Sequence, residues 1–311
     1  MIVTVAPNTA IDHIFFIPKF ESSRTIRATG STQSVGSKPS NVSWILSEMD
    51  IPSLALGFAA DMTGKKLEAL LMERGISVDF TWSDGETRRN IVIVPDDGNA
   101  QTTITASTLK VTPAQQNALL ETYRRALDDA TCVVMGGTLP EGVAPSFYAD
   151  LIRLGRERGL PVLFDASEPL LSAGLAAHPT YVKPNRHELE AFAGHPLPSI
   201  DAVYEAGRDL QARFGVSPII SLDADGALAV LPDRAYRIPP LQVEVVNAAG
   251  AGDAVVAGIA AALDRGGSIE DGLRLGFACA TAVLLRPGTA ECTRADIDYF
   301  LPQIELISFS R

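Results

Sequence analysis

Short, continuously apolar runs alternate with segments of helical periodicity along most of this chain, and this alternation is what most limits its fold. The runs at residues 132–135 and 161–164 are apolar at successive positions, as in strands that are buried on both faces. Segment 147–158 between them has the apolar spacing of a helix. Parallel strands need crossover connections, which are usually helices. The sequence therefore predicts an α/β fold with a mostly parallel sheet covered on both faces.

Further segments extend the pattern in both directions along the chain. Strands are predicted at residues 1–5, 181–182, 219–222, 227–231 and 242–246. Helices are predicted at residues 42–49, 67–75, 112–128, 187–193, 201–214, 268–285 and 294–305, with another that follows residue 250 and ends near 263.

Two segments, 11–35 and 86–105, interrupt the alternation. They contain alternating or threonine-rich strands with no helix between them, at residues 14–17, 25–32, 90–94 and 101–105. The acidic, glycine-containing residues 96–99 suit a hairpin turn. Because no linker, repeat or low-complexity segment is visible, we expect residues 1–311 to form one domain with a small antiparallel β-strand lid inserted into it.

Composition narrows the class of protein. The chain has 311 residues, of which 46% are hydrophobic and 20% charged, so it can bury a large core. A net charge of −11 argues against nucleic acid or anionic membranes as main partners. The longest apolar stretch, 254–263, is too short to cross a bilayer. Three widely spaced cysteines indicate free thiols, and no targeting segment is visible, so we expect a cytoplasmic protein.

The most informative motif for function lies at residues 247–258 (NAAGAGDAVVAG). A predicted strand leads into small residues, and a helix begins behind them, so backbone N–H groups at the start of that helix can bind an anionic phosphate. Asp253 lies in the same first turn, where a carboxylate could accept a proton from an attacking hydroxyl. The motif predicts phosphoryl transfer to an alcohol. By itself it is equally typical of a helix whose first-turn acid only complements the dipole.

Several other motifs occur along the chain in a recognisable order. They are residues 4–12 (TVAPNTAID), 35–42 (VGSKPSNV), 85–90 (GETRRN), 137–143 (GTLPEGV), 182–189 (VKPNRHEL) and 221–226 (SLDADG). In these motifs and in 247–258 the chain resembles the ribokinase-like sugar kinases of the phosphofructokinase B type, over essentially its whole length. Within that family it is most similar to the 1-phosphofructokinases and tagatose-6-phosphate kinases. The resemblance implies a ribokinase-like three-layer α/β/α sandwich with a β lid.

The resemblance also assigns roles to individual positions. Asp253 would be the general base, and the N–H groups of Ala249, Gly250, Ala251 and Gly252 would form an anion hole. The nucleotide would contact Lys183, Asn185, Ser221, Leu222, Asp223, Ala224, Asp225 and Gly226. The sugar would contact Asp12, Gly36, Ser37, Lys38, Asn41, Arg88 and Asn90. Asn185 and Glu188 would hold Mg²⁺, partly through water.

Lys38 and Arg88 form a basic pair on the sugar side, which favours an acceptor that already carries a phosphate. The expected reaction is therefore ATP- and Mg²⁺-dependent phosphorylation of a phosphorylated ketohexose, either fructose 1-phosphate or tagatose 6-phosphate. The alternatives are a kinase for a nonphosphorylated sugar or nucleoside, and a non-catalytic sugar-phosphate sensor. The sensor is suggested by Ser37, Pro39 and Asp223, which stand where the family has glycines. In this family lids often pair between subunits, which suggests a homodimer.

Simpler readings exist for the binding residues. Asn185 and Glu188 have the spacing of a capping box, which alone would explain them. Arg88, with Arg89 beside it, could be a solvated surface residue, as could Lys38. Asp12 could be a turn former ahead of a lid strand. The direction of each side chain decides whether it has the functional role or the simpler one.

Overall fold

The computed structural model describes residues 1–96, 101–106 and 108–310. Its centre is a ten-stranded sheet in the order β16-β15-β14-β13-β12-β11-β10-β1-β4-β5. The strands of the parallel part are β1 (Ile2–Ala6), β4 (Ser53–Ala59), β5 (Ser77–Trp82), β10 (Cys132–Gly136), β11 (Val162–Asp165), β12 (Tyr181–Val182) and β13 (Ser217–Ser221). Strands β14 (Ala227–Val230), β15 (Ala235–Ile238) and β16 (Ile307–Ser308) continue it antiparallel. The predicted mostly parallel sheet is confirmed.

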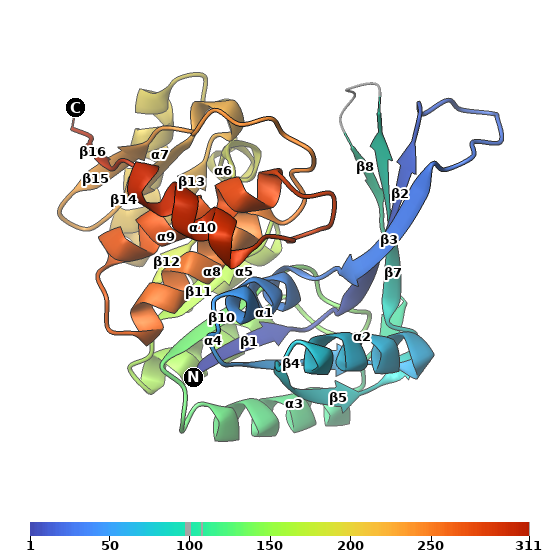
Figure 1. The fold of residues 1–311 in the computed structure, drawn as a ribbon. Helices are drawn as coiled ribbons and strands as arrows, with labels where there is room; N and C mark the ends of the chain where they lie inside the picture. The colour runs from blue at the N-terminus through green and yellow to red at the C-terminus, as the bar shows by residue number, and fades with distance from the viewer. Residues whose placement is uncertain (97–100, 107, 311) are drawn as a thin grey trace.

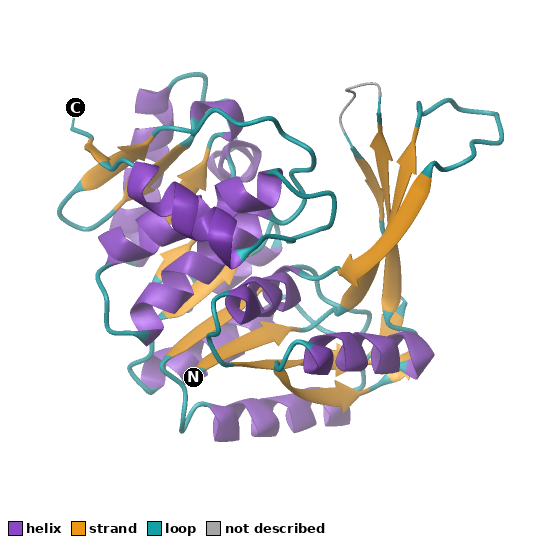
Figure 2. Ribbon diagram, in the orientation of Figure 1, coloured by secondary structure: helices purple, strands orange, loops and turns teal. Residues whose placement is uncertain are grey.

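Helices cover both faces of this sheet (Figures 1 and 2). They are α1 (Lys38–Glu48), α2 (Asp61–Glu73), α3 (Pro113–Ala126), α4 (Ser146–Glu157), α5 (Leu170–Leu175), α6 (Arg186–Ala193), α7 (Ile200–Phe214), α8 (Ala251–Asp264), α9 (Ile269–Leu284) and α10 (Arg294–Phe300). One core cluster contains residues of α3 to α7, and a second contains residues of α1, α8, α9 and α10. The apolar sequence runs became strands with both faces buried because each lies between these two clusters.

A second sheet stands beside the main body as a lid (Figure 1). Its order is β3-β2-β7-β8, formed by β2 (Ala10–Ile17), β3 (Gly30–Val35), β7 (Arg88–Pro95) and β8 (Thr102–Ile104). The outer pairs are antiparallel, but β2 and β7 are parallel, so the expectation of an antiparallel lid is wrong for its central pair. Parallel pairing needs a long connection, and the segment between β2 and β7, which contains β3, α1, β4, α2, β5 and β6 (Asp84–Gly85), provides one. The short strands β6 and β9 (Leu109–Lys110) pair separately.

Several predicted boundaries were wrong. Residues 242–246 form no strand; Val245 and Val246 are half exposed, and the N–H of Val246 donates to the carbonyl of Leu284 at the end of α9. The strand predicted at 25–32 begins only at residue 30. Helix α10 ends at residue 300 and a 3₁₀ turn follows, because Pro302 cannot donate an N–H to the α-helix. The predicted turn at 96–99 falls mostly outside the described residues.

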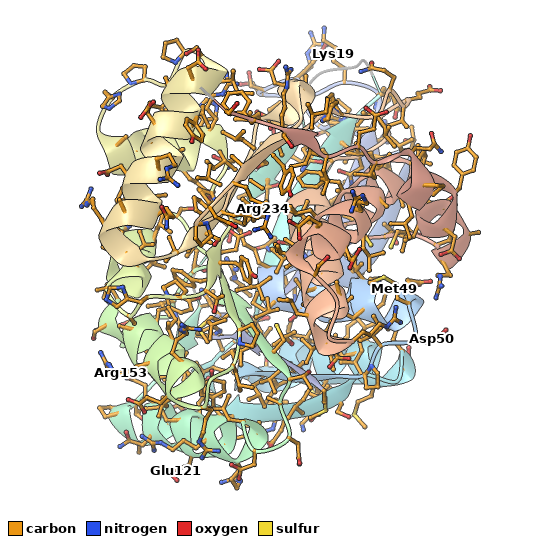
Figure 3. All side chains as sticks on the ribbon, turned by 90° about the vertical axis from the view of Figure 1, so that its left-hand side faces the viewer. Lys19, Met49, Asp50, Glu121, Arg153 and Arg234 are labelled. Atoms are coloured by element: carbon orange, nitrogen blue, oxygen red, sulfur yellow. The ribbon has the colours of Figure 1, made fainter. Side chains whose placement is uncertain are left out.

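The antiparallel end of the main sheet is fastened to the helical layer. Arg234, in the turn between β14 and β15, donates from Nε to Oε1 of Glu270 at 2.7 Å, and the hydroxyl of Tyr236 donates to the same oxygen at 3.0 Å. Figure 3 shows Arg234 beside the helices of this face. Across the described ranges, no helix combines the length and the apolar character that crossing a bilayer would require.

Candidate active site

The predicted motifs meet at the carboxyl ends of the parallel strands. Asp165 is the last residue of β11, Lys183 follows β12, and Gly136 ends β10. Lys38 and Asn41 lie in the first turns of α1, and α8 begins at residue 251. Because parallel strands end at one edge of a sheet, these residues come together although they are far apart in sequence. The lid begins at the same edge.

Asp253 is buried in the first turn of α8, with a side chain held in one orientation. It is 7% exposed, and its Oδ2 accepts a hydrogen bond of 2.7 Å from Nδ2 of Asn41. Burial raises the pKa of Asp253 to about 7, and the negative charge of Asp165 adds to this effect. Lys38, the Asn41 hydrogen bond and Lys183 oppose it. A carboxyl that titrates near neutrality has the proton affinity of an efficient general base.

The loop before α8 presents free backbone donors, but fewer than the sequence suggested. The N–H of Ala249 donates to Oδ1 of Asn247, and that of Ala251 donates to the carbonyl of Ala248. Within the described part of the chain, the N–H groups of Gly250, Gly252 and Asp253 have no such partner. Gly250 adopts φ 87°, and a Cβ there would lie 2.6 Å from the nitrogen of Ala290, so both conformation and space require glycine.

Asp165 joins the two lysines of the site, and sequence reasoning missed it. Its Oδ1 accepts from Nζ of Lys38 at 2.5 Å, and its Oδ2 lies 3.2 Å from Nζ of Lys183. Burial alone would raise the pKa of Asp165, but Lys183 and Lys38 outweigh burial and lower it. An acid at the end of an apolar strand was the available signal. Lys38 is thus a paired site residue and not the solvated lysine of the simpler reading.

Asn185 and Glu188 form a capping box at the start of α6, as the simpler interpretation of their spacing predicts. Asn185 Oδ1 accepts from the N–H of Glu188 at 2.8 Å, and Glu188 Oε2 accepts from the N–H of Asn185 at 2.9 Å. Glu188 Oε1 accepts from Ser167 at 2.7 Å and lies 3.8 Å from Nζ of Lys38. This second oxygen faces the site, so Glu188 fits a water-mediated Mg²⁺ contact better than Asn185, whose oxygen the cap engages. Among the described residues, no group of three or more His, Cys, Asp or Glu is arranged to hold a metal.

Asp12 lies within strand β2 and is not a turn former. It is 6% exposed; its Oδ1 accepts from Asn90 Nδ2 at 2.7 Å and its Oδ2 accepts from the hydroxyl of Thr289 at 2.9 Å. A Cβ on Gly36 would lie 2.1 Å from Oδ1. Burial raises the pKa of Asp12, while the hydrogen bonds from Asn90 and Thr289 and the charge of Arg88 oppose it. Thr289 carried no signal in the sequence.

The two adjacent arginines have opposite environments. The guanidinium of Arg88 donates to the hydroxyl of Thr105 at 2.7 Å and to the carbonyl of Asn8 at 3.4 Å. Arg89 instead donates to Thr63 and pairs with Glu86 at the surface, where its side chain is 61% exposed. Strand alternation therefore directs Arg88 towards Asp12 and Arg89 away from it.

Buried polar atoms without partners gather around Asp12 and Asp253. Within the described ranges they include Oδ1 of Asn8, of Asn41 and of Asn90, together with Nε of Arg88. Native proteins rarely leave such groups unpaired, because each costs the free energy of its lost hydration. A polar ligand that binds here would supply the missing partners.

The predicted nucleotide segment forms a tight turn at the end of β13. The N–H of Leu222 donates to the carbonyl of Gly226, and a 3₁₀ turn spans Asp223–Asp225. Leu222 belongs to the hydrophobic core, so its side chain is not a ligand. Asp223 is exposed with φ 50°, and Asp225 pairs with Arg186 at 2.9 Å. Ala224 and Gly226 complete this turn.

The altered sugar motif is accommodated without strain. Ser37 precedes α1 in extended conformation, and its hydroxyl donates to Ser40 at 2.7 Å. Pro39 lies in the first turn of α1, where the missing N–H costs no hydrogen bond. A hollow of about 340 Å³ opens beside Lys38, lined by Gly137, Thr138, Leu139, Val143, Pro145, Ser167, Glu168, Pro169 and Leu170. Of the predicted sugar ligands, Lys38 lines this hollow.

A buried carboxyl beside free helix N-terminal donors, at the edge of an α/β sheet that a β lid flanks, is the arrangement expected of a phosphotransferase of the sugar kinase class. The sequence profile of the pfkB family carbohydrate kinases matches residues 3–296. The chain belongs to this family and is a carbohydrate kinase.

The chain is similar to individual relatives in sequence and to solved structures in fold. The chain is 35% identical over 290 residues to the 1-phosphofructokinase of Haloferax volcanii, covering 93% of this chain and 92% of the relative. Among solved structures, the phosphofructokinase-2 of Escherichia coli in complex with potassium superposes with a TM-score of 0.89 at 25% identity, covering 97% and 98% of the two chains. The ribokinase of Arabidopsis thaliana complexed with ribose and ATP has a TM-score of 0.78 at 20% identity, over 96% and 98%. The predicted ribokinase-like fold and family are confirmed.

Proposed function

We propose that this kinase transfers the γ-phosphoryl group of ATP to the free primary hydroxyl of fructose 1-phosphate. The observation that carries the chemistry is Asp253, a buried carboxyl with a pKa near 7 beside three free N–H groups at the start of α8. Two observations support this choice of substrate. A relative that is 35% identical is named 1-phosphofructokinase, and the guanidinium of Arg88 interacts electrostatically with the sugar-side acid Asp12.

In this proposal the substrate hydroxyl oxygen attacks the γ-phosphorus while its proton passes to Asp253. A bond forms between that oxygen and phosphorus, and the bond from phosphorus to the β–γ bridging oxygen breaks, which releases ADP. The N–H groups of Gly250, Gly252 and Asp253 would stabilise the negative charge that develops on the transferred group. Asn41 would hold the carboxylate in line through its 2.7 Å hydrogen bond.

The charged groups around Asp253 would bind the remaining phosphate oxygens. Lys183 lies at the strand ends beside α8, and a Cβ on Gly252 would come within 3.0 Å of its Nζ, so this ammonium reaches the anion-binding loop. ATP would lie against residues 221–226, and Glu188 would hold Mg²⁺ through water. When bound, Mg²⁺ would neutralise charge on the phosphates of ATP.

The substrate assignment is tested with a panel of fructose 1-phosphate, tagatose 6-phosphate, fructose 6-phosphate and free fructose, each assayed with Mg²⁺ and ATP. We expect the highest kcat/KM with fructose 1-phosphate, and ³¹P NMR should identify the product as fructose 1,6-bisphosphate. A preference for tagatose 6-phosphate would change the assigned substrate but leave the proposed phosphoryl transfer unchanged. Equal turnover of free fructose would support the nonphosphorylated-sugar alternative. Binding of the phosphosugars without any turnover would support the sensor.

We further propose a homodimer in which lid sheets meet. Ile91 and Ile104, which are paired across β7 and β8, are 41% and 53% exposed. Apolar side chains on an exposed sheet face are typical of a surface that another chain covers. The phosphofructokinase-2 of Escherichia coli has been solved in a tetrameric inhibited form, so a related chain of this fold does assemble.

A further inference from the structure

Thr289 lies in the connection between α9 and α10, yet its hydroxyl reaches the carboxylate of Asp12 in the lid strand β2. It is 3% exposed and donates to Oδ2 at 2.9 Å. The opposite oxygen, Oδ1, accepts from Asn90 in β7. Asp12 is therefore held by one donor from the lid and one from the main body.

A carboxylate needs both donors because rotation about its last side-chain torsion is soft. The Cβ–Cγ bond of aspartate has a broad torsional preference, so packing alone leaves the plane of the oxygens poorly defined. Each oxygen can accept about two hydrogen bonds, and Asn90 and Thr289 use one on each. The remaining acceptor positions are then directed, which is what recognition of sugar hydroxyls requires.

The segment that carries Thr289 is itself fixed to the anion-binding loop. The N–H of Ala290 donates to the carbonyl of Ala249 at 2.9 Å, and Nδ2 of Asn247 donates to the carbonyl of Pro287 at 2.8 Å. Ala290 is fully buried with φ 55° and packs against Gly250. One short segment thus contacts the acid on the sugar side and the loop on the phosphate side.

We propose that Thr289 is a positioning residue for sugar recognition, which orients the Asp12 carboxylate relative to the anion-binding loop. This inference rests on the proposed function for the identity of the sugar, but not for the contact itself. Removal of the Thr289 hydroxyl lets the Asp12 carboxylate rotate, but it removes no group that contacts ATP in the proposed function. The substitution should therefore weaken binding of the sugar phosphate and leave binding of the nucleotide unchanged.

The test compares Thr289→Val with Thr289→Ser, and uses Thr281→Val as the matched control. Thr281 is a buried threonine of α9 whose hydroxyl donates to the carbonyl of Phe277, so the same substitution there removes a threonine hydroxyl and its hydrogen bond away from Asp12. We expect Thr289→Val to raise KM for fructose 1-phosphate about tenfold, a typical effect of one hydrogen bond to a charged group. KM for ATP should change less than about twofold, and Thr289→Ser should restore the wild-type KM.

Calorimetric binding of fructose 1-phosphate without ATP provides a second readout that is independent of turnover. If the wild type binds but never phosphorylates this sugar, the proposed function fails, while a Thr289→Val loss of binding still supports the positioning role. Thr289→Ala replaces the valine variant if that protein does not fold. The proposal is overturned if the hydroxyl-free variant binds as the wild type does, if Thr289→Ser is equally impaired, or if KM for ATP rises in parallel.

Discussion

At the scale of single residues, the charges around Asp253 decide what the site can do. Asp165 and Asp253 share a buried environment, but two lysines pair with Asp165 and keep it ionised. Among the residues that the structure describes, Asp253 has only the Asn41 amide as a direct partner. The pKa of Asp165 is therefore lowered and that of Asp253 is raised to about 7. Environments that separate two pKa values in this way are typical of sites where one carboxyl accepts a proton, which supports the proposed role of Asp253.

Replacement of Asp253 by Asn should remove the proton acceptor while it preserves the size of the side chain. We expect kcat to fall by about 10²–10⁴-fold, the usual contribution of general acid–base catalysis, with KM for ATP nearly unchanged. Asp264→Asn at the other end of α8 is the control, and should retain wild-type kcat. Steady-state kinetics of both variants decide; an active Asp253→Asn enzyme would exclude Asp253 as the base.

The pH dependence of kcat/KM should report the same group. Because only the ionised form accepts a proton, log kcat/KM should rise with slope one at acid pH and level off above about pH 7. Folding stability should respond with the opposite sign. A carboxyl whose pKa is higher in the folded state than its value of 3.8 favours folding below that value, and this contribution is lost as the pH rises through about 7. A kcat/KM profile that is flat from pH 5 to 8 would contradict the proposed role.

At the scale of elements, strand alternation and helix starts place the functional groups. In β7, successive side chains point to opposite faces, so neighbouring arginines receive different environments. In α8, a left-handed glycine precedes the first turn and leaves helix N–H groups free for an anion. Sequence periodicity predicted both elements, but not which arginine faces the site or which N–H groups remain free.

The arginine pair provides a matched experiment on one strand. Arg88→Ala should raise KM for fructose 1-phosphate by about tenfold or more, since it removes a charge-assisted contact to phosphate. The same substitution should raise KM for free fructose much less. Arg89→Ala changes an exposed neighbour that contacts Thr63 and Glu86, and should leave both KM values near wild type. Equal effects of the two substitutions would place the phosphate elsewhere.

The start of α8 can be tested with two glycines of similar conformation. Gly250→Ala introduces a Cβ at φ 87° that would lie 2.6 Å from the nitrogen of Ala290, so we expect reduced stability and a large loss of kcat. Gly266→Ala, at φ 72° with no atom within 4 Å of the new Cβ, should cost only about 1 kcal/mol of stability from backbone strain, with kcat unchanged. Thermal unfolding and kcat, measured for both variants, distinguish the steric clash at residue 250 from the backbone strain at residue 266. Equal kcat in both variants would refute the proposed role of this loop.

At the scale of the whole molecule, the candidate active site lies between the parallel sheet and a lid that carries part of the proposed sugar-binding set. Asp12, Arg88 and Asn90 come from the lid, whereas Asp253, Lys38 and Asp165 come from the main body. The Asp12–Thr289 hydrogen bond is one of the contacts that join the two parts. Anything that orders the lid, including a second subunit, therefore acts on the sugar side of the site.

The proposed lid-mediated dimer has a direct test. Ile91→Lys places a charge on the exposed face of β7 and should shift the mass measured by light scattering from dimer to monomer. Ile307→Lys, on β16 at the far edge of the main sheet and with a similar exposure of 47%, should leave the mass unchanged. A wild-type protein that is monomeric at high concentration would refute the dimer.

The sequence by itself determined the layered α/β fold, the existence of the lid and the kinase motif at residues 247–258, because apolar periodicity and a glycine-rich helix start are local signals. Tertiary structure alone decided that residues 242–246 form no strand, that β2 and β7 pair in parallel, and that Asp165 and Thr289 belong to the site. These features depend on contacts between residues more than 70 positions apart, or on a neighbouring strand that is missing among the described residues. Side-chain direction and the pKa of Asp253 arise from such contacts, which no local pattern encodes.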